Sequence, residues 1–241
     1  MIQTNHNAFT ISKREFFAEG KKMMSRKFAL FDFDGVIADT ENSNAAYLQK
    51  ALSYWAIKLT EEDKRALIGT KDGEYINRVL SRASSPISQE DLRERRSEVG
   101  NTYENGKLCA ECGIKKLIDY LREQGIKTAL VSSTSAKLII TALNRLKMMD
   151  MFDVIVCGDM CAAAKPNPEG YKKAMEYLGA SPEECVVVED SKAGILAGKQ
   201  AGAYVIAYTG GSIEHDVREA DCQIKSFMNI EEVIKNFRQI D

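Results

Sequence analysis

Long hydrophobic runs are absent from this sequence of 241 residues, because no apolar stretch approaches the roughly 18 residues that cross a bilayer. A large excess of one charge sign is also absent, since the formal net charge is −2 and no global field would recruit nucleic acid or an anionic membrane. We therefore expect neither a membrane nor a nucleic-acid partner. The composition, 44% hydrophobic and 28% charged, is ordinary for a globular chain with one core, or with a core that carries a smaller inserted domain.

Histidine is scarce, with only two residues, so the six cysteines have few partners for a zinc site. The motifs Cys109-x-x-Cys112 and Cys157-x-x-x-Cys161 resemble two halves of such a site by spacing alone. However, Cys157 ends one strand-like run and Cys185 opens another. We favour the interpretation that the cysteines are buried and reduced, with zinc as the alternative.

Residues 1–26 differ from the rest of the chain, with scattered basic side chains and no continuous apolar stretch like the core of a signal peptide. We interpret this segment as a tail. Without an export signal the expected location is cytoplasmic, a reducing compartment in which disulfides are rare.

Short apolar runs alternate with helical patterns along most of the chain, and this alternation is the main indication of the fold. The runs suit buried parallel strands and lie at residues 28–31, 128–131, 154–156, 185–188 and 204–207. Apolar residues at helical spacing fill residues 113–123, 135–146, 168–178 and 191–201. The pattern predicts an α/β fold, with a Rossmann-like parallel sheet covered by helices on both faces.

One stretch breaks this alternation, because residues 42–107 contain helical patterns and no convincing strand. Candidate helices begin near residues 45, 60, 74 and 88, and the second opens with a capping-box pattern. We predict that residues 27–41 and 108–241 form the α/β core and that residues 42–107 form an inserted all-helical domain.

The first polar cluster is Asp32-Phe33-Asp34-Gly35-Val36, directly after the first predicted strand. Two carboxylates this close to a buried strand need compensation, which a divalent metal and a phosphate would provide. Gly35 allows a tight turn and a close backbone approach to phosphate. An ordinary exposed Asp-Gly turn is the alternative reading of this motif alone.

Three more polar clusters follow predicted strands, at the sheet edge where open parallel sheets bind ligands. Ser132-Ser133-Thr134-Ser135 offers hydroxyls and free amides to a phosphate, or simply caps a helix. Lys165, in the sequence Lys165-Pro166-Asn167-Pro168, offers a point charge that can neutralise a phosphate, or else is a surface lysine. Glu189-Asp190-Ser191 adds two carboxylates, or a helix cap. Four such clusters together make the alternatives poor explanations.

This set of motifs, in this order, resembles the haloacid dehalogenase-like superfamily from about residue 27 to the C-terminus. Asp32 to Val36 matches its first motif, Ser132 its second, Lys165 its third and Glu189-Asp190 its fourth. The segments at residues 39–41 and 189–195 are similar to the subgroup of β-phosphoglucomutases and sugar-phosphate phosphatases. Members of that subgroup carry a helical cap between the first two motifs, where the predicted helical domain lies.

The resemblance implies a phosphoryl transfer in which Asp32 is the nucleophile and becomes an aspartyl phosphate, while Asp34 acts as general acid and then general base. The partner would be a small phosphorylated metabolite and the cofactor Mg²⁺. The implied phosphate-binding residues are Gly35, Ser132, Ser133 and Lys165, and the implied metal ligands are Asp32, Asp34, Asp190 and, directly or not, Glu189. Neither the substrate's identity nor the oligomeric state follows from the sequence.

The implied cap would close over the core to exclude water and select substrate. Residues 39–43 and 106–109 are the expected hinges. Tyr103 and the segment 69–73 are candidates for contacts from the cap side, but core packing for Tyr103 and a turn for 69–73 are the favoured interpretations.

Water is the expected phosphoryl acceptor, which makes the protein a phosphatase, with a β-phosphoglucomutase-type mutase as the alternative. Those mutases have a histidine where this chain has Asn44 and a cap arginine where it has Asp72, although Lys71 would compensate if the register slips by one. A metal-free dehalogenase would leave Asp34 without a role. A non-catalytic binding module on the same fold is the remaining alternative, and it would have no need for all four motifs.

Overall fold

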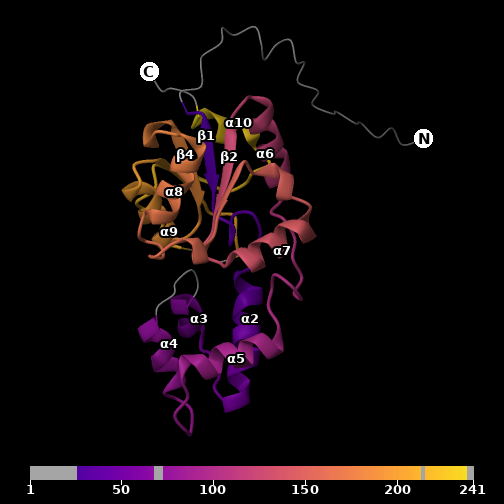
Figure 1. Ribbon diagram of the computed structural model, residues 1–241, viewed down its shortest axis with the longest axis vertical. Helices are drawn as coiled ribbons and strands as arrows, with labels where there is room; N and C mark the ends of the chain where they lie inside the picture. Colours follow the sequence, from indigo (N-terminus) through magenta and orange to yellow (C-terminus); the bar gives the residue numbers. More distant parts are fainter. Residues whose placement is uncertain (1–25, 68–72, 213–214, 238–241) are drawn as a thin grey trace, which may run out of the picture.

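The computed structural model describes residues 26–67, 73–212 and 215–237, and its centre is a six-stranded sheet (Figure 1). The strand order is β3-β2-β1-β4-β5-β6 and every neighbouring pair is parallel. This confirms the predicted α/β fold and each of its five strands. The strands are β1 (Phe28–Phe31), β2 (Lys127–Val131), β3 (Val154–Val156), β4 (Cys185–Glu189), β5 (Tyr204–Tyr208) and β6 (Cys222–Ile224).

Both faces of the sheet are covered because alternate strand residues point to opposite sides. Ala29 and Phe31 belong to one buried cluster, with apolar residues of α6 (Ile114–Glu123), α7 (Ala136–Leu146) and α10 (Ile230–Lys235). Phe28 and Leu30 belong to the other, with α8 (Glu169–Leu178) and α9 (Lys192–Gln200). The central strands β1 and β4 are buried along their whole length, as their continuous apolar runs predict.

Four helices follow β1 and form a separate lobe, which Figure 1 shows beyond one end of the sheet. We call residues 41–99 the helical lobe. Its own buried cluster includes Leu52, Ile57, Val79 and Leu92. Between β1 and α6 the described residues contain no extended strand. The α-helices are α2 (Glu41–Leu52), α3 (Glu61–Leu67), α4 (Gly73–Leu80) and α5 (Gln89–Val99), and short 3₁₀ turns lie at Ser53–Trp55, Met149–Met151, Gly158–Met160 and Pro182–Glu184.

Two chain segments connect the helical lobe to the core, and they lie side by side. Ala38 and Ala110 form an antiparallel bridge, and the Glu111 amide donates to the Ile37 carbonyl at 2.8 Å. The predicted hinges lie next to these two segments, at residues 39–43 and 106–109. The hinges, and the predicted limits of the inserted helical domain at residues 42 and 107, stay predictions.

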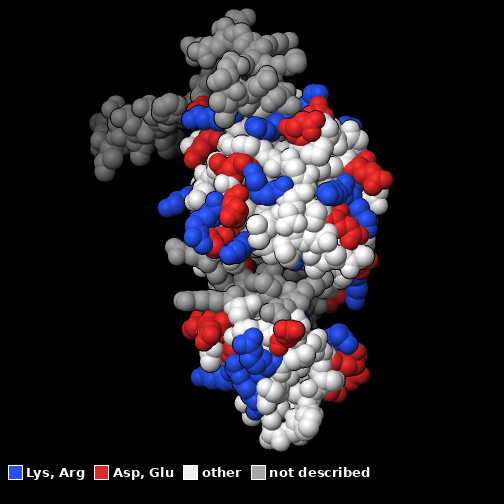
Figure 2. Space-filling model, turned by 90° about the vertical axis from the view of Figure 1, so that its left-hand side faces the viewer, with Lys and Arg blue, Asp and Glu red and all other residues white. Residues whose placement is uncertain are grey.

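On the face in Figure 2, basic and acidic side chains are interspersed over the core, in keeping with the small net charge of −2. No helix in the described part of the chain is both long and apolar enough to span a bilayer.

Candidate active site

The predicted site residues meet at the carboxyl edge of the sheet, where the strand order changes direction. β1 lies between β2 and β4, so the segments that follow these three strands are neighbours. Asp32 follows β1, Ser132 follows β2 and Glu189 ends β4. Lys165 reaches the same place from the loop that precedes α8. The sheet topology therefore brings together motifs that are up to 157 positions apart, at the place where such sheets bind ligands.

Lys165 is the centre of a buried charge cluster. Its ammonium donates to Asp32 Oδ1 at 2.7 Å, to Glu189 Oε1 at 2.7 Å and to the Val131 carbonyl at 3.1 Å. Its side chain is only 11% exposed. Burial alone would lower the pKa of Lys165, but the Asp32 and Glu189 carboxylates raise it well above its ordinary value. Lys165 is therefore a fixed positive charge, which excludes the reading of a solvated surface lysine.

Both oxygens of Glu189 are engaged, and this fixes the loop after β4. Oε1 accepts from the Tyr171 hydroxyl at 2.9 Å as well as from Lys165. Oε2 accepts from the Asp190 amide at 3.0 Å and from the Ser191 amide and hydroxyl, each at 3.1 Å. A Cβ at Gly194 would lie 1.6 Å from Oε1, so only glycine fits there. Glu189 thus positions both Lys165 and the Asp190 backbone.

Asp190 supplies an unsatisfied acceptor to the cluster. Its Oδ1 is buried and has no hydrogen-bond partner within the described chain, which is costly unless a ligand uses it. Carboxylate oxygens of Asp32, Glu189 and Asp190 lie within 4.8 Å of one another. Burial raises the pKa of Asp32 to about 8 although Lys165 opposes the shift, and burial with the neighbouring carboxylates raises that of Asp190 well above its usual range. Three buried carboxylates and one ammonium leave excess negative charge, which a divalent cation would offset.

Asp34 is held by three hydroxyl groups. Tyr103 donates to Oδ1 at 2.7 Å, Thr134 donates to Oδ2 at 3.1 Å, and the Thr40 hydroxyl also donates to Oδ1. Burial, reinforced by the Asp34 charge, raises the pKa of Tyr103 well above its ordinary value, so its hydroxyl keeps its proton. Tyr103 also packs against Phe33, with ring centroids 6.1 Å apart. Tyr103 therefore both packs in the core and contacts a predicted site residue.

A cavity of about 380 Å³ lies over these groups, between the core and the helical lobe. Its volume suits a small metabolite. The core contributes acidic, basic and hydroxyl side chains, and the helical lobe contributes polar, basic and apolar ones. Among the lining residues are Asp32, Asp34, Ser133, Thr134, Lys165 and Asp190 from the core and Glu41, Asn44, Leu48, Lys64 and Arg96 from the helical lobe.

Comparison with known proteins agrees with this geometry. The family model described as haloacid dehalogenase-like hydrolase matches residues 29–208. This chain belongs to that family. Among similar proteins, the phosphorylated carbohydrates phosphatase of Thermotoga maritima is 31% identical over 173 residues, which is 72% of this chain and 80% of the relative. Hexitol phosphatase A of Escherichia coli is 30% identical over 211 residues, which is 86% of this chain and 94% of the relative.

Among solved structures, that of CbbY from Rhodobacter sphaeroides in complex with phosphate superposes with a TM-score of 0.72 and 28% identity, and it covers 85% of this chain and 96% of that one. The family therefore extends over both lobes of the described chain, not over the sheet alone.

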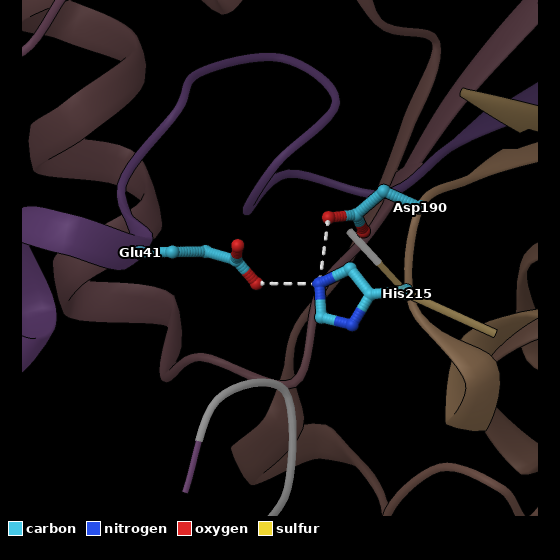
Figure 3. A group of neighbouring side chains, drawn as sticks. All are labelled: Glu41, Asp190 and His215. Atoms are coloured by element: carbon cyan, nitrogen blue, oxygen red, sulfur yellow. Dashed lines mark hydrogen bonds and ion pairs between the residues drawn. The ribbon is translucent and has the colours of Figure 1, made fainter. Parts of the chain in front are cut away.

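Two side chains at the site were not assigned a role by the family motifs, Glu41 and His215 (Figure 3). His215 Nε2 lies 3.1 Å from Glu41 Oε1 and 3.8 Å from Asp190 Oδ2. Glu41 is the first residue of α2, whereas His215 belongs to the core segment between β5 and β6. The pair thus joins the helical lobe to the core beside Asp190. Glu41 belongs to the segment 39–41 that resembles the subgroup of β-phosphoglucomutases and sugar-phosphate phosphatases. His215 belongs to no motif and follows no predicted strand directly, so the sequence did not indicate it.

The remaining predicted phosphate-binding residues lie at the site, and their roles stay predictions. Ser132 is buried and accepts from the Thr134 amide at 3.0 Å, while Ser133 lines the cavity. Gly35 has φ +84°, and a Cβ there would lie 1.9 Å from Asp190 Oδ2. Its glycine identity is therefore required by the turn and by Asp190. The segment 69–73, with Lys71 and Asp72, lies almost wholly outside the described residues.

The cysteine prediction was partly wrong. Cys157 and Cys185 are buried, as expected, but Cys109 and Cys112 are exposed because they lie in the segment that connects the helical lobe to α6, not in the sheet. All six are free thiols. In the described chain, no group of three or more metal-ligand side chains includes a cysteine.

Proposed function

We propose that this protein is a Mg²⁺-dependent phosphatase that hydrolyses a small phosphorylated metabolite, a sugar phosphate above all, through an aspartyl phosphate on Asp32. The observation that carries the proposal is the buried cluster of Asp32, Lys165 and Asp190, in which a fixed ammonium contacts the nucleophile and a carboxylate oxygen has no partner among the described residues. The family is that of a hydrolase, and two of its similar members are named as phosphatases of phosphorylated carbohydrates and of hexitol phosphate.

The donors available at the site suit magnesium. Asp32, the Asp34 carbonyl and Asp190 would hold the ion, because Mg²⁺ takes a few carboxylate oxygens and completes its shell with water and phosphate. When bound, the ion supplies positive charge that reduces repulsion between the carboxylate and the anionic phosphate. The two oxygens of Glu189 already accept from Lys165, Tyr171 and the loop amides, so in this proposal Glu189 orients the site from behind.

Two steps follow from the placement of the side chains. In the first, an Asp32 oxygen attacks phosphorus, the bond from phosphorus to the leaving oxygen breaks, and Asp34 gives that oxygen a proton. In the second, water attacks phosphorus of the aspartyl phosphate, the bond from phosphorus to the Asp32 oxygen breaks, and Asp34 takes the proton of the water; inorganic phosphate leaves, and the Asp32 carboxylate and the Asp34 carboxylic acid are restored. Lys165 and the hydroxyls after β2 would neutralise and orient the phosphate oxygens. Tyr103 and Thr134 aim the Asp34 carboxyl by holding both of its oxygens.

The helical lobe would act as the cap that covers the site and selects the substrate. It contributes roughly half of the cavity lining, and the two segments that connect it to the core pair with each other at Ala38 and Ala110. Tyr103, near the start of the segment that leads from the helical lobe back to the core, donates a hydrogen bond to Asp34.

Hydrolysis is favoured over mutase chemistry by the position of Asn44. Where the resemblance places a mutase histidine, Asn44 lines the cavity and its amide donates to the Tyr103 hydroxyl at 3.3 Å. An amide cannot take up or deliver a proton as an imidazole does. The absence of an acid–base side chain at this position favours water as the acceptor in this proposal.

The test is phosphate release from a panel of sugar and polyol phosphates, with and without Mg²⁺, by the wild type and Asp32→Asn. We expect the wild type to need the metal and Asp32→Asn to lose at least about 10³-fold in kcat while it keeps its near-ultraviolet circular dichroism. Normal turnover by folded Asp32→Asn would refute the assignment. In a second assay, β-glucose 1-phosphate is mixed with a trace of the 1,6-bisphosphate, and glucose 6-phosphate that forms faster than free phosphate would establish the mutase instead.

A further inference from the structure

Arg96 differs from the other arginines of the helical lobe whose side chains are described. It is exposed overall, it has no hydrogen-bond or ion-pair partner within the described chain, and it lines the cavity. Every other one has an intramolecular partner and none lines that cavity: Arg78 stacks on Tyr75, Arg82 binds Asp63, Arg93 binds Glu90, and Arg95 binds Glu98 and stacks on Tyr54.

Three of the four acidic groups that share the cavity with Arg96 already have partners, and the fourth, Asp190, belongs to the buried carboxylate cluster after β4, where the metal is proposed to bind. Glu41 lies within hydrogen-bond distance of His215 at 3.1 Å, and Asp34 accepts from Tyr103 and Thr134. Asp32 pairs with Lys165. Arg96 therefore lines the cavity without pairing with any of its carboxylates in the described chain. An arginine in such a place is a ready partner for a bound anion, because its planar fork matches a carboxylate or a phosphate with two parallel hydrogen bonds.

The position of Arg96 indicates which part of the substrate it would meet. It enters from the last turn of α5, whereas Lys165 and Ser133 enter from the core beside the nucleophile. The scissile phosphate is neutralised from the core side in the proposed mechanism. Arg96 is thus placed for the part of the substrate beyond the leaving oxygen.

We propose that Arg96 binds a second anionic group at the far end of the substrate, so that the substrates are small phosphate esters that also carry a carboxylate or a second phosphate. This inference rests on the proposed phosphatase function and narrows its substrate class. It makes Arg96 a specificity-determining residue that contacts substrate, without a part in the two chemical steps.

Matched substrates test the inference. Sorbitol 6-phosphate is the neutral-ended reference, 6-phosphogluconate adds a carboxylate at the far end, and sorbitol 1,6-bisphosphate adds a phosphate there. Each is assayed with wild type, Arg96→Gln and Arg96→Lys in Mg²⁺. Arg93→Gln is the control, because Arg93 lies on the same helix, pairs with Glu90 and does not line the cavity.

The wild type should prefer at least one of the two anionic substrates in kcat/KM, and the preferred one identifies the anion. Arg96→Gln should lose about 10- to 100-fold in kcat/KM on that substrate and less than about threefold on sorbitol 6-phosphate, as expected for a hydrogen-bonded charge pair. Arg96→Lys should recover part of the loss, and Arg93→Gln should match the wild type. An equal loss on all three substrates would mean that Arg96 serves the scissile phosphate, and no loss would mean that it serves neither; either result overturns the inference.

Calorimetric binding separates this inference from the proposed function. The same three compounds are titrated into Asp32→Asn and into Asp32→Asn with Arg96→Gln, so that the result does not depend on turnover. Tighter binding of an anionic compound that vanishes with Arg96→Gln supports the inference even if the wild type hydrolyses none of the three. If Arg96→Gln does not change the binding of any of the three compounds while the wild type hydrolyses them, the inference is wrong and the proposed phosphatase function is unaffected.

Discussion

At the scale of single residues, Gly35 is the position where a backbone conformation and the candidate metal site depend on each other. Its φ of +84° favours glycine, and a Cβ there would lie 1.9 Å from Asp190 Oδ2. Gly35→Ala should therefore displace Asp190 and raise the Mg²⁺ concentration for half-maximal thermal stabilisation by about tenfold or more. Differential scanning fluorimetry across a Mg²⁺ titration measures this.

Gly125→Ala is the control for that variant. Gly125 has a similar φ of +80° but no atom within 4 Å of the added Cβ. Both substitutions share a backbone cost of about 1 kcal/mol, so both should unfold earlier than wild type. Only Gly35→Ala should also lose its response to Mg²⁺. Equal Mg²⁺ responses in the two variants would show that Asp190 does not bind the ion.

The residues that the sequence identified were those whose motif sits at a strand end. Asp32, Lys165 and Asp190 were found because charged groups beside buried strands are rare without a purpose. Arg96 and His215 were missed because the groups around them come from distant parts of the chain, and a helix surface or a loop carries no local sign of what it faces. Their roles depend on how the two lobes meet, which no local pattern encodes.

At the scale of secondary-structure elements, an ion pair between a buried Asp63 and a partly exposed Arg82 joins α3 to the segment just after α4 in the helical lobe. Asp63 is 1% exposed and accepts two hydrogen bonds from Arg82, at 2.6 and 2.7 Å. Tyr75 and the Thr60 amide also donate to it. The Arg82 hydrogen bonds, which outweigh burial, lower the pKa of Asp63 below its ordinary 3.8.

Asp63→Asn should destabilise the helical lobe by about 2 kcal/mol at pH 7, because the amide cannot match the fork of Arg82 and leaves its charge uncompensated. Urea unfolding monitored by Trp55, the only tryptophan and a residue of this lobe, measures the effect. The exposed Glu90 pairs with the exposed Arg93, so Glu90→Gln serves as a control and should change nothing measurable.

The same comparison has a defined pH dependence. Because the folded pKa of Asp63 is depressed, its contribution is fully present above the ordinary value of 3.8 and is lost as the pH falls below it. Asn does not titrate, so the advantage of the wild type over Asp63→Asn should be constant from pH 7 to about pH 5 and shrink toward pH 3. An advantage that persists unchanged at pH 3 would contradict the ion-pair account.

Elements were predictable where the hydrophobic pattern was long or continuous. The five buried strands and the helices between them followed from apolar runs and helical spacing, and each is present. The strand β6 and the helix α10 were missed. Cys222–Ile224 has three residues with an exposed glutamine in the middle, and α10 spans six, so neither leaves enough pattern to recognise. Tertiary packing against β5 and the core creates both.

At the scale of the whole molecule, function depends on two separately packed lobes that share one cavity. The helical lobe has its own buried cluster, and the core has one on each face of the sheet. The contact of His215 with Glu41 crosses between the two lobes, and Tyr103, in the connecting segment, donates to Asp34. In the proposed function the core would supply the chemistry, and the helical lobe would supply the surface that distinguishes one phosphate ester from another.

The most direct test of this account is to trap the covalent intermediate. Asp34→Ala is mixed with p-nitrophenyl phosphate and Mg²⁺, because that leaving group needs no general acid whereas the attacking water needs a general base. The reaction is quenched in acid within milliseconds to seconds, and peptides are mapped by mass spectrometry. The account predicts a burst of nitrophenol and one phosphoryl group on Asp32. A burst with the phosphoryl group on another residue, or steady turnover without any phosphorylated peptide, would contradict it.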